Sequence, residues 1–231
     1  SVWNEADIEP EPFGDRPVFG GLDLAQRNDM TALVFLAGDD EADIESHFWL
    51  PSHEIGERSK ADRAPYDIWA ETGALHLSDG TSVNYREVAE QIIYARDNYN
   101  LKSVAYDPNM SQALWPCLED LGMSTEEREA LFHKVNQSYA GMSPGIEEFQ
   151  SLLRDGKVRH GGHEVLEWHA RNAVLIRGRV SDQFLLAKPK GAPHRRIDGI
   201  VACCMAAGRR AEMLEDFNEP SYIETAELMV L

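Results

Sequence analysis

Three apolar runs of strand length lie close together near the start of the chain, and they constrain the fold more than any other feature. Residues 18–24, 31–37 and 44–50 are rich in β-branched and aromatic side chains, and short polar links separate them. Consecutive strands joined by short links usually pair with one another as an antiparallel meander. We therefore expect three antiparallel strands to begin a sheet.

The rest of the chain alternates between helical and strand-like patterns. Asn84 and Glu87 form a helix N-cap pattern ahead of an apolar stripe at helical spacing. Strands are predicted at residues 101–106, 132–136, 173–180 and 183–188. Further helices are predicted from Asp107 to about Leu121 and at residues 143–153, 163–172 and 197–210. This order predicts an α/β fold with a mixed central sheet flanked by helices.

Composition narrows the class of protein. The 231 residues are 43% hydrophobic and 27% charged, as in soluble globular proteins. No apolar run approaches the roughly 18 residues that a membrane-spanning helix needs. The cysteines are odd in number, and Cys203 and Cys204 are adjacent, so with Cys117 they fit free thiols in a reducing cytoplasm better than a disulfide framework or a metal site.

Charge is distributed very unevenly along the chain. The net charge is -18, which disfavours binding to phosphate groups. Residues 151–210, however, hold 12 Lys and Arg against 5 Asp and Glu, a net charge of +7, whereas the remainder carries -25. Such asymmetry is compatible with a basic face on an acidic body. The alternative is that these basic residues scatter around the fold and form no patch.

Three carboxylates occupy the ends of apolar elements. Asp23 and Asp107 end predicted strands, and Asp198 begins the last predicted helix. Buried carboxylates are costly unless they are paired or bind a metal. Three together would repel one another, and a divalent cation would relieve that repulsion. Oxygen ligands of this kind select Mg²⁺ or Mn²⁺, and two such ions can support phosphodiester hydrolysis.

Each of these acids also has a purely structural interpretation. Asp107 precedes a proline and could be a turn residue, Asp198 could cap its helix, and Asp23 could cap a loop. Asp29 could return beside Asp23 as an auxiliary ligand, or it could be a turn residue. Lys188 could offset the charge of a phosphate or of the acids, or it could be an ordinary solvated lysine.

Four segments carry a resemblance to a known family. They are GGLDLAQRNDMTALVFL (20–36), VAYDPNMSQALWPCLEDLG (104–122), GMSPGIEEFQSLLRDGKVRHGGHEVLEWHARNAVL (141–175) and AKPKGAPHRRIDGIVACCMAAGR (187–209). In this order they resemble the nuclease domain of the large terminase subunit of tailed double-stranded DNA bacteriophages. The DL…DxTALV opening and the late RIDGIVA segment are specific only in combination.

The resemblance implies an RNase H-like fold and an endonuclease that uses two Mg²⁺ or Mn²⁺ ions to cut concatemeric viral DNA during genome packaging. It implies that the catalytic and metal-binding acids are Asp23, Asp107 and Asp198, with Asp29 as an accessory ligand. Basic residues would contact the DNA backbone, and the candidates are Lys188, Arg195 and Arg196.

The resemblance also predicts the organisation of the chain and its partners. Residues 1–16 would be a linker from an N-terminal packaging ATPase, whose G-x-x-x-x-G-K-[ST] motif this chain lacks. Residues 17–211 would form the nuclease domain, and residues 212–231 an acidic tail. The expected partners are double-stranded DNA, the small terminase subunit and the portal protein. The location would be the host cytoplasm, at the procapsid, with no membrane contact and a monomeric isolated domain.

Two other functions fit the same residues. An RNase H-like nuclease of the resolvase or transposase kind would act on branched DNA or on DNA ends. A non-catalytic docking module of a packaging motor would use the acids only structurally. The strong overall acidity leads us to expect weak DNA binding by the isolated domain, with DNA approaching from the side of the basic segment.

Overall fold

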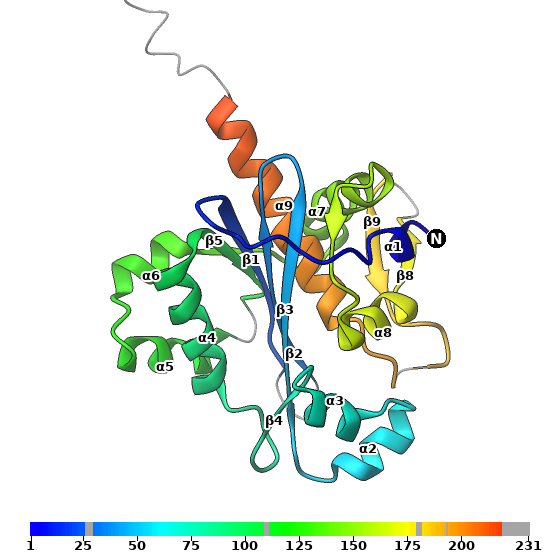
Figure 1. Cartoon of the computed structure of the whole chain (residues 1–231). Coiled ribbons are helices and arrows are strands. Elements are labelled where there is room, and N and C mark those ends of the chain that lie inside the picture. Colours follow the sequence, from blue (N-terminus) through cyan, green and yellow to red (C-terminus); the bar gives the residue numbers. More distant parts are fainter. Residues whose placement is uncertain (26–29, 109–110, 179–181, 193, 219–231) are drawn as a thin grey trace, which may run out of the picture.

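The computed structural model describes residues 1–25, 30–108, 111–178, 182–192 and 194–218. Its centre is a seven-stranded mixed sheet in the order β4-β3-β2-β1-β5-β6, with β7 also paired to β3 (Figure 1). The strands are β1 (Pro17–Asp23), β2 (Thr31–Ala37), β3 (Ala42–Pro51), β4 (His76–Ser78), β5 (Asn100–Tyr106), β6 (Phe132–Lys134) and β7 (Val158–Arg159). The first three pair antiparallel, which confirms the predicted meander, whereas β5 runs parallel to β1 and β6 parallel to β5.

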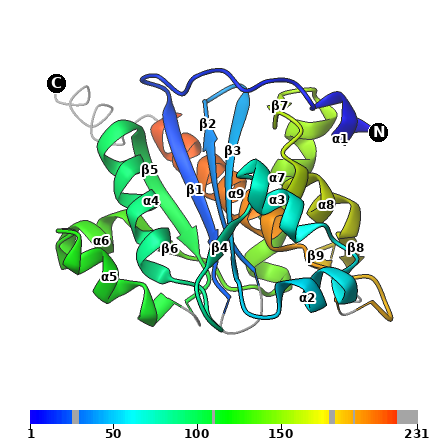
Figure 2. The ribbon, with the colours of Figure 1, turned by 60° about the horizontal axis from the view of Figure 1, so that its bottom comes forward.

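Helices cover both faces of this sheet, with α4 and α5 on one side and α7 and α9 on the other (Figures 1 and 2). The helices are α1 (Val2–Glu5), α2 (Ile55–Asp62), α3 (Tyr66–Thr72), α4 (Tyr85–Asn98), α5 (Trp115–Asp120), α6 (Thr125–Leu131), α7 (Tyr139–Arg154), α8 (Glu164–Asn172) and α9 (Asp198–Asn218), with a 3-10 turn at Ser111–Ala113. Strands β8 (Val174–Arg177) and β9 (Phe184–Ala187) form a separate antiparallel hairpin, which confirms the predicted strand pair.

Strand β2 shows why this part of the sequence is apolar without interruption. All seven of its residues are buried. Ala32, Val34 and Leu36 belong to the core beneath α7 and α9, while Leu33 and Phe35 belong to the core beneath α4. Successive side chains of a strand point to opposite faces, so a strand covered on both faces needs an apolar residue at every position.

Helix boundaries depend on local caps. The Asn84 side chain accepts a hydrogen bond from the Arg86 amide at 3.1 Å, so the predicted start of α4 is confirmed. Helix α7 begins four residues before its predicted start at residue 143, because Ser138 caps it. Helix α6 was not predicted at all. Its Ser124 and Glu127 form a complete capping box, a signal that is visible in the sequence.

The N-terminal segment, predicted to be a linker, packs on the domain instead. Ala6 and Phe13 are buried, and the His160 amide donates to the Ala6 carbonyl at 3.0 Å. The Arg16 guanidinium donates to the buried Asp43 carboxylate at 2.5 Å. Figure 2 shows this segment passing over the ends of β3 and β2, on the side of the sheet where β7 lies. Because it supplies core side chains and a buried ion pair, residues 1–16 are part of the folded unit.

At the other end, α9 continues to Asn218, past the predicted start of an acidic tail at residue 212. The apolar pattern of this helix ends near Arg210. The helix continues beyond that point because its last turns need no buried face. Within the described residues, no helix is both long and apolar enough to span a membrane.

Candidate active site

Asp23 and Asp107 come from neighbouring parallel strands at the same edge of the sheet. In the pairing of β1 with β5, Leu22 lies opposite Tyr106, and each of these residues is followed directly by one of the two aspartates. Both acids are half-buried. Parallel strands end at the same edge of the sheet. Asp23 and Asp107, which are 84 positions apart in the sequence, therefore follow neighbouring strand ends.

Helix α9 runs back along these two strands, so its first residues lie at the same edge. A Cβ atom on Gly21 would stand 1.9 Å from the carbonyl oxygen of Ala202, so β1 and α9 are in direct backbone contact there. Near the other end of α9, the Arg210 side chain donates a hydrogen bond to the Gly38 carbonyl at 2.9 Å. The Gly38 amide in turn donates to the carbonyl of Pro17, the first residue of β1. Asp198 is one turn before Ala202, and this turn brings it toward the end of β1.

Asp23 and Asp107 lie on the face of the sheet that α9 covers. Side chains alternate along a strand, so Asp23 lies on the face of Gly21, which α9 covers. On β5, the Ser103 hydroxyl accepts a hydrogen bond from Arg209 of α9 at 3.1 Å. Continuing the alternation beyond β5 gives Asp107 that same face. The convergence of the three carboxylates stays a prediction.

Helix α8 holds the first turn of α9 in place. The Asn172 side chain donates to the Arg196 carbonyl at 3.1 Å and accepts from the Arg195 guanidinium at 2.7 Å. His169, one turn earlier, accepts from the Gly199 amide at its Nδ1 atom at 2.9 Å. Its Nε2 atom lies 4.0 Å from Oδ2 of Asp198. Asp198 is therefore an 8% exposed acid at a helix start that a second helix anchors.

Gln137 is a polar neighbour of this site that the sequence did not reveal. Its side-chain amide donates to Oδ1 of Asp23 at 3.0 Å. Gln137 follows β6, which is the neighbour of β5 in the sheet. A lone glutamine in a loop carries no recognisable motif, so only the strand order could bring it to Asp23.

The donor chemistry of the three acids suits a hard divalent cation. Each offers carboxylate oxygens, and all three are at least partly shielded from water, which strengthens their attraction to a cation. Among the described residues, no group of three or more His, Cys, Asp or Glu side chains is gathered closely enough to hold a metal ion. The fold thus brings the three positions to one edge, while their carboxylates do not form a closed cage.

Comparison with known proteins identifies the family. Residues 1–215 match the family described as "Terminase large subunit, endonuclease domain". The chain belongs to this family. The large terminase subunit of Enterobacteria phage HK97 is 34% identical over 216 residues, which cover 90% of this chain and 40% of that protein. Protein YmfN of Escherichia coli K12 is 28% identical over 86% of this chain and 44% of its own length. The chain therefore spans less than half of either relative.

Solved structures support the fold of this terminase nuclease domain. The crystal structure of the HK97 large terminase matches with a TM-score of 0.80 and 35% identity, over 90% of this chain and 42% of that one. The large terminase nuclease of thermophilic phage G20c matches with a TM-score of 0.55 at 13% identity, over 89% of this chain and 96% of that one. The RNase H-like fold expected from the sequence is thereby confirmed.

The remaining predicted site residues of the terminase nuclease domain have different outcomes. Asp29 lies outside the described residues. Lys188 follows β9 and is half-buried. Burial lowers the pKa of His169 most, and the charges of Arg196, His163 and Lys188 lower it further. Lys188 is therefore close to the turn that carries Asp198. Arg195 is half-buried and bonded to Asn172.

Arg196 requires a correction, because it cannot contact DNA in this conformation. It is 7% exposed, and its Nε atom donates to the Asp62 carboxylate and the Tyr66 hydroxyl, each at 2.9 Å. This buried cluster joins the start of α9 to α2 and α3. Adjacent basic residues in a sequence can face opposite environments, so Arg196 is a structural residue of the terminase nuclease domain.

The basic segment 151–210 does not form one continuous positive patch. Among the described residues, ion pairs with carboxylates are seen for seven of its cations, namely Lys157, Arg159, Arg171, Arg177, Arg196, Arg209 and Arg210. Their partners are spread over both ends of the chain and several elements. This distribution favours the alternative in which the basic residues scatter around the fold.

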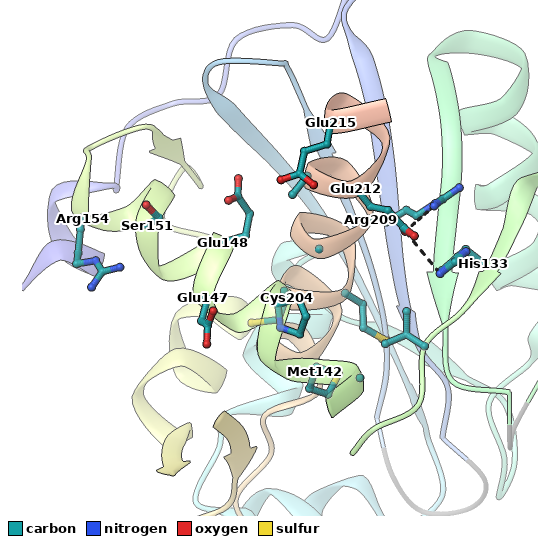
Figure 3. Close-up of a pocket in the computed structure, with 17 residues that line it drawn as sticks. His133, Met142, Glu147, Glu148, Ser151, Arg154, Cys204, Arg209, Glu212 and Glu215 are labelled. Carbon is teal, nitrogen blue, oxygen red and sulfur yellow. Dashed lines mark hydrogen bonds and ion pairs between the residues drawn. The ribbon is translucent and has the colours of Figure 1, made fainter. Parts of the chain in front are cut away.

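A groove of about 730 Å³ between α7 and α9 lies apart from the three aspartates (Figure 3). Glu147, Glu148, Glu212 and Glu215 line it, and the figure shows Glu212 between Arg209 and His133. Arg154 and Arg209 also line it, and Arg209 is ion-paired with Glu212. The excess of carboxylates disfavours a phosphate backbone in this groove.

Proposed function

We propose that this domain is a metal-dependent endonuclease that hydrolyses phosphodiester bonds of double-stranded viral DNA during genome packaging. The observation that carries the proposal is the backbone arrangement: β1 and β5 pair in parallel and end next to Asp23 and Asp107, and α9, which begins at Asp198, is in backbone contact with β1. Family membership supports it. The G20c nuclease, which shares the fold, has been solved with bound magnesium and with bound cobalt.

In this proposal the three carboxylates hold two divalent cations, Mg²⁺ or Mn²⁺. Asp23 would contact both, while Asp107 and Asp198 would each hold one, and Asp29 would be an auxiliary ligand. When bound, the cations would activate the attacking water and stabilise the leaving oxygen, which yields a 3′-hydroxyl and a 5′-phosphate. Lys188 and Arg195 would contact backbone phosphates, which positions DNA without reading its sequence.

The wider role follows from the family. Concatemeric DNA would be the substrate, and the small terminase subunit and the portal protein would be partners in the complete packaging motor, in the host cytoplasm. The domain itself has a net charge of -18, and Arg196, next to the start of α9, is ion-paired with Asp62. We therefore propose that it binds DNA weakly when isolated and that the rest of the motor supplies most of the affinity.

Plasmid cleavage in Mg²⁺ or Mn²⁺ tests the proposal directly. Asp23→Asn keeps the shape of the side chain but removes the charge, so we expect cleavage to fall on the order of a thousandfold or more. Asp97→Asn, at an exposed acid of α4, is the matched control and should cut like the wild type. Equal cleavage by wild type and Asp23→Asn would overturn the assignment of the site.

Two further measurements separate the other functions. A docking module with structural acids would show no Mn²⁺-dependent rise in melting temperature, whereas a metal site stabilises the folded state by mass action. A resolvase-like nuclease would prefer four-way junctions to linear duplex. We expect a Mn²⁺-dependent shift in the wild type, none in Asp23→Asn, and no preference for junctions.

A further inference from the structure

His169 is a fully buried histidine whose ring lies between the core and the candidate metal-binding acid Asp198. It is 0% exposed, and its ring packs edge-on against Phe48 with centroids 5.2 Å apart. Gly199 makes this packing possible, because a Cβ atom there would stand 2.9 Å from Nδ1 of His169. The ring is thus held between β3, α8 and the first turn of α9.

The hydrogen bonds of the ring define which nitrogen carries the proton. Nδ1 accepts a hydrogen bond from the Gly199 amide at 2.9 Å, so it holds a lone pair and no proton. With Nδ1 unprotonated, the ring is neutral and its single N–H is on Nε2.

The nitrogen that carries this N–H lies near the carboxylate of Asp198. Nε2 is buried and has no hydrogen-bond partner among the described residues, and it lies 4.0 Å from Oδ2 of Asp198. That distance is longer than a hydrogen bond, so the proposed contact requires the two groups to approach each other. Metal-binding carboxylates are usually oriented by a hydrogen bond to their other oxygen.

We propose that His169 is a positioning residue that donates from Nε2 to one oxygen of Asp198 and leaves the other oxygen for the divalent cation. The inference rests on the proposed function, since it assigns a role toward the same site. The Gly199 amide selects the tautomer, Phe48 and α8 hold the ring, and Asp198 receives a neutral donor that does not cancel its negative charge.

Two substitutions divide the functions of the two ring nitrogens. The side-chain oxygen of His169→Asn can replace Nδ1 as acceptor for Gly199, but this variant has no donor at the Nε2 position. His169→Gln reaches the Nε2 position with an amide donor. We expect His169→Asn to bind Mn²⁺ about 10–100-fold more weakly than the wild type in calorimetry, and His169→Gln to recover most of that loss.

His160→Asn provides the control for loss of a buried ring. His160 is 3% exposed and stacks on Trp3, away from the acids. The His160→Asn substitution should lower the melting temperature and leave the Mn²⁺ affinity unchanged. Wild-type affinity in His169→Asn, or equal weakness in His169→Asn and His169→Gln, would overturn the inference.

Long-range ¹H–¹⁵N NMR of the wild-type chain provides a readout that needs no variant and no metal. The expected pattern for His169 is a protonated Nε2 and an unprotonated Nδ1. A proton on Nδ1 would overturn the positioning role while leaving the proposed nuclease function intact. Failure of the wild type itself to bind Mn²⁺ would instead overturn the proposed function.

Discussion

Gly21 of β1 and Ala202 of α9 touch backbone to backbone: a Cβ atom on Gly21 would lie 1.9 Å from the Ala202 carbonyl oxygen and 3.0 Å from the Ala206 amide nitrogen. Asp23 follows Gly21 by two residues, and Asp198 precedes Ala202 by one helical turn. The separation of these two acids is therefore determined by a contact that only glycine permits.

Gly21→Ala should uncouple the acids. The new methyl group must push α9 away from β1, and overpacking of this kind costs about 1–3 kcal/mol or more. A displacement of about 1 Å can lower a catalytic rate on the order of a hundredfold. We expect urea denaturation to show a less stable protein, and plasmid cleavage to fall further than the remaining folded fraction explains.

Gly56→Ala is the matched control for that substitution. Gly56 lies in α2, and nothing lies within 4 Å of a Cβ atom built there. Alanine is preferred to glycine in helices by about 0.5–1 kcal/mol, so this variant should be as stable as the wild type or more so. Wild-type cleavage by Gly21→Ala would show that the backbone contact does not control the site.

Asp43→Asn should release the N-terminal segment. The Asp43 side chain is fully buried, and it accepts hydrogen bonds from Arg16 at 2.5 Å and from Arg159 at 2.7 Å. Removing the charge leaves two arginines without their shared partner. Because both arginines are partly exposed, we expect a loss of about 3 kcal/mol, the low end for a broken buried pair. Faster proteolysis within residues 1–16 should accompany it.

The same carboxylate predicts a pH dependence. Burial alone would raise the pKa of Asp43, but the hydrogen bonds from Arg159 and Arg16 outweigh it and lower the pKa. A lowered folded-state pKa stabilises the protein above the unfolded value of about 3.9, and this contribution is lost as the pH falls below it. The stability gap between wild type and Asp43→Asn should therefore narrow in acid. A constant gap at every pH would exclude this origin.

Arg196→Ala should mainly lower the stability of the protein, whereas Lys188→Ala should mainly weaken DNA binding. Arg196 is buried against Asp62 and Tyr66, so its loss leaves a buried carboxylate unpaired and should cost about 3–5 kcal/mol in denaturation experiments. Lys188 is half-buried rather than buried, so Lys188→Ala should lower stability less than Arg196→Ala does. It should weaken DNA binding and reduce the slope of log affinity against log salt by about one. A stable Arg196→Ala variant with weakened DNA binding would contradict this division.

The cysteines should differ sharply in reactivity. Cys203 and Cys204 are buried in α9, and burial raises the pKa of both thiols. Cys117 is half-buried on α5, where burial and Asp120 raise its pKa more modestly. We expect iodoacetamide to modify Cys117 first in the native protein and all three cysteines in denaturant, as measured by mass spectrometry. Early labelling of Cys203 would indicate that α9 detaches readily.

Much of the fold could be predicted from the sequence because its signals are local. The apolar runs at residues 18–24 and 31–37, the Asn84 cap and the buried pattern of the last helix each report how a short segment meets the core. The starts of α6 and α7 differed from the prediction although local caps mark them. The N-terminal boundary of the domain differed because distant contacts determine it. The N-terminal segment has a polar, proline-containing composition typical of a linker, but Phe13 and the Arg16–Asp43 pair attach it to the domain.

The features of the candidate site also separate into those visible in the sequence and those that required the structure. The sequence determined which acids stand at the ends of apolar elements, because carboxylates interrupt apolar patterns visibly at Asp23, Asp107 and Asp198. Only the tertiary structure decided their neighbours: Gln137 beside Asp23, His169 beside Asp198, and Arg196 turned into the core. Strand order and helix packing join residues more than a hundred positions apart, and no local pattern encodes which of two adjacent arginines faces inward.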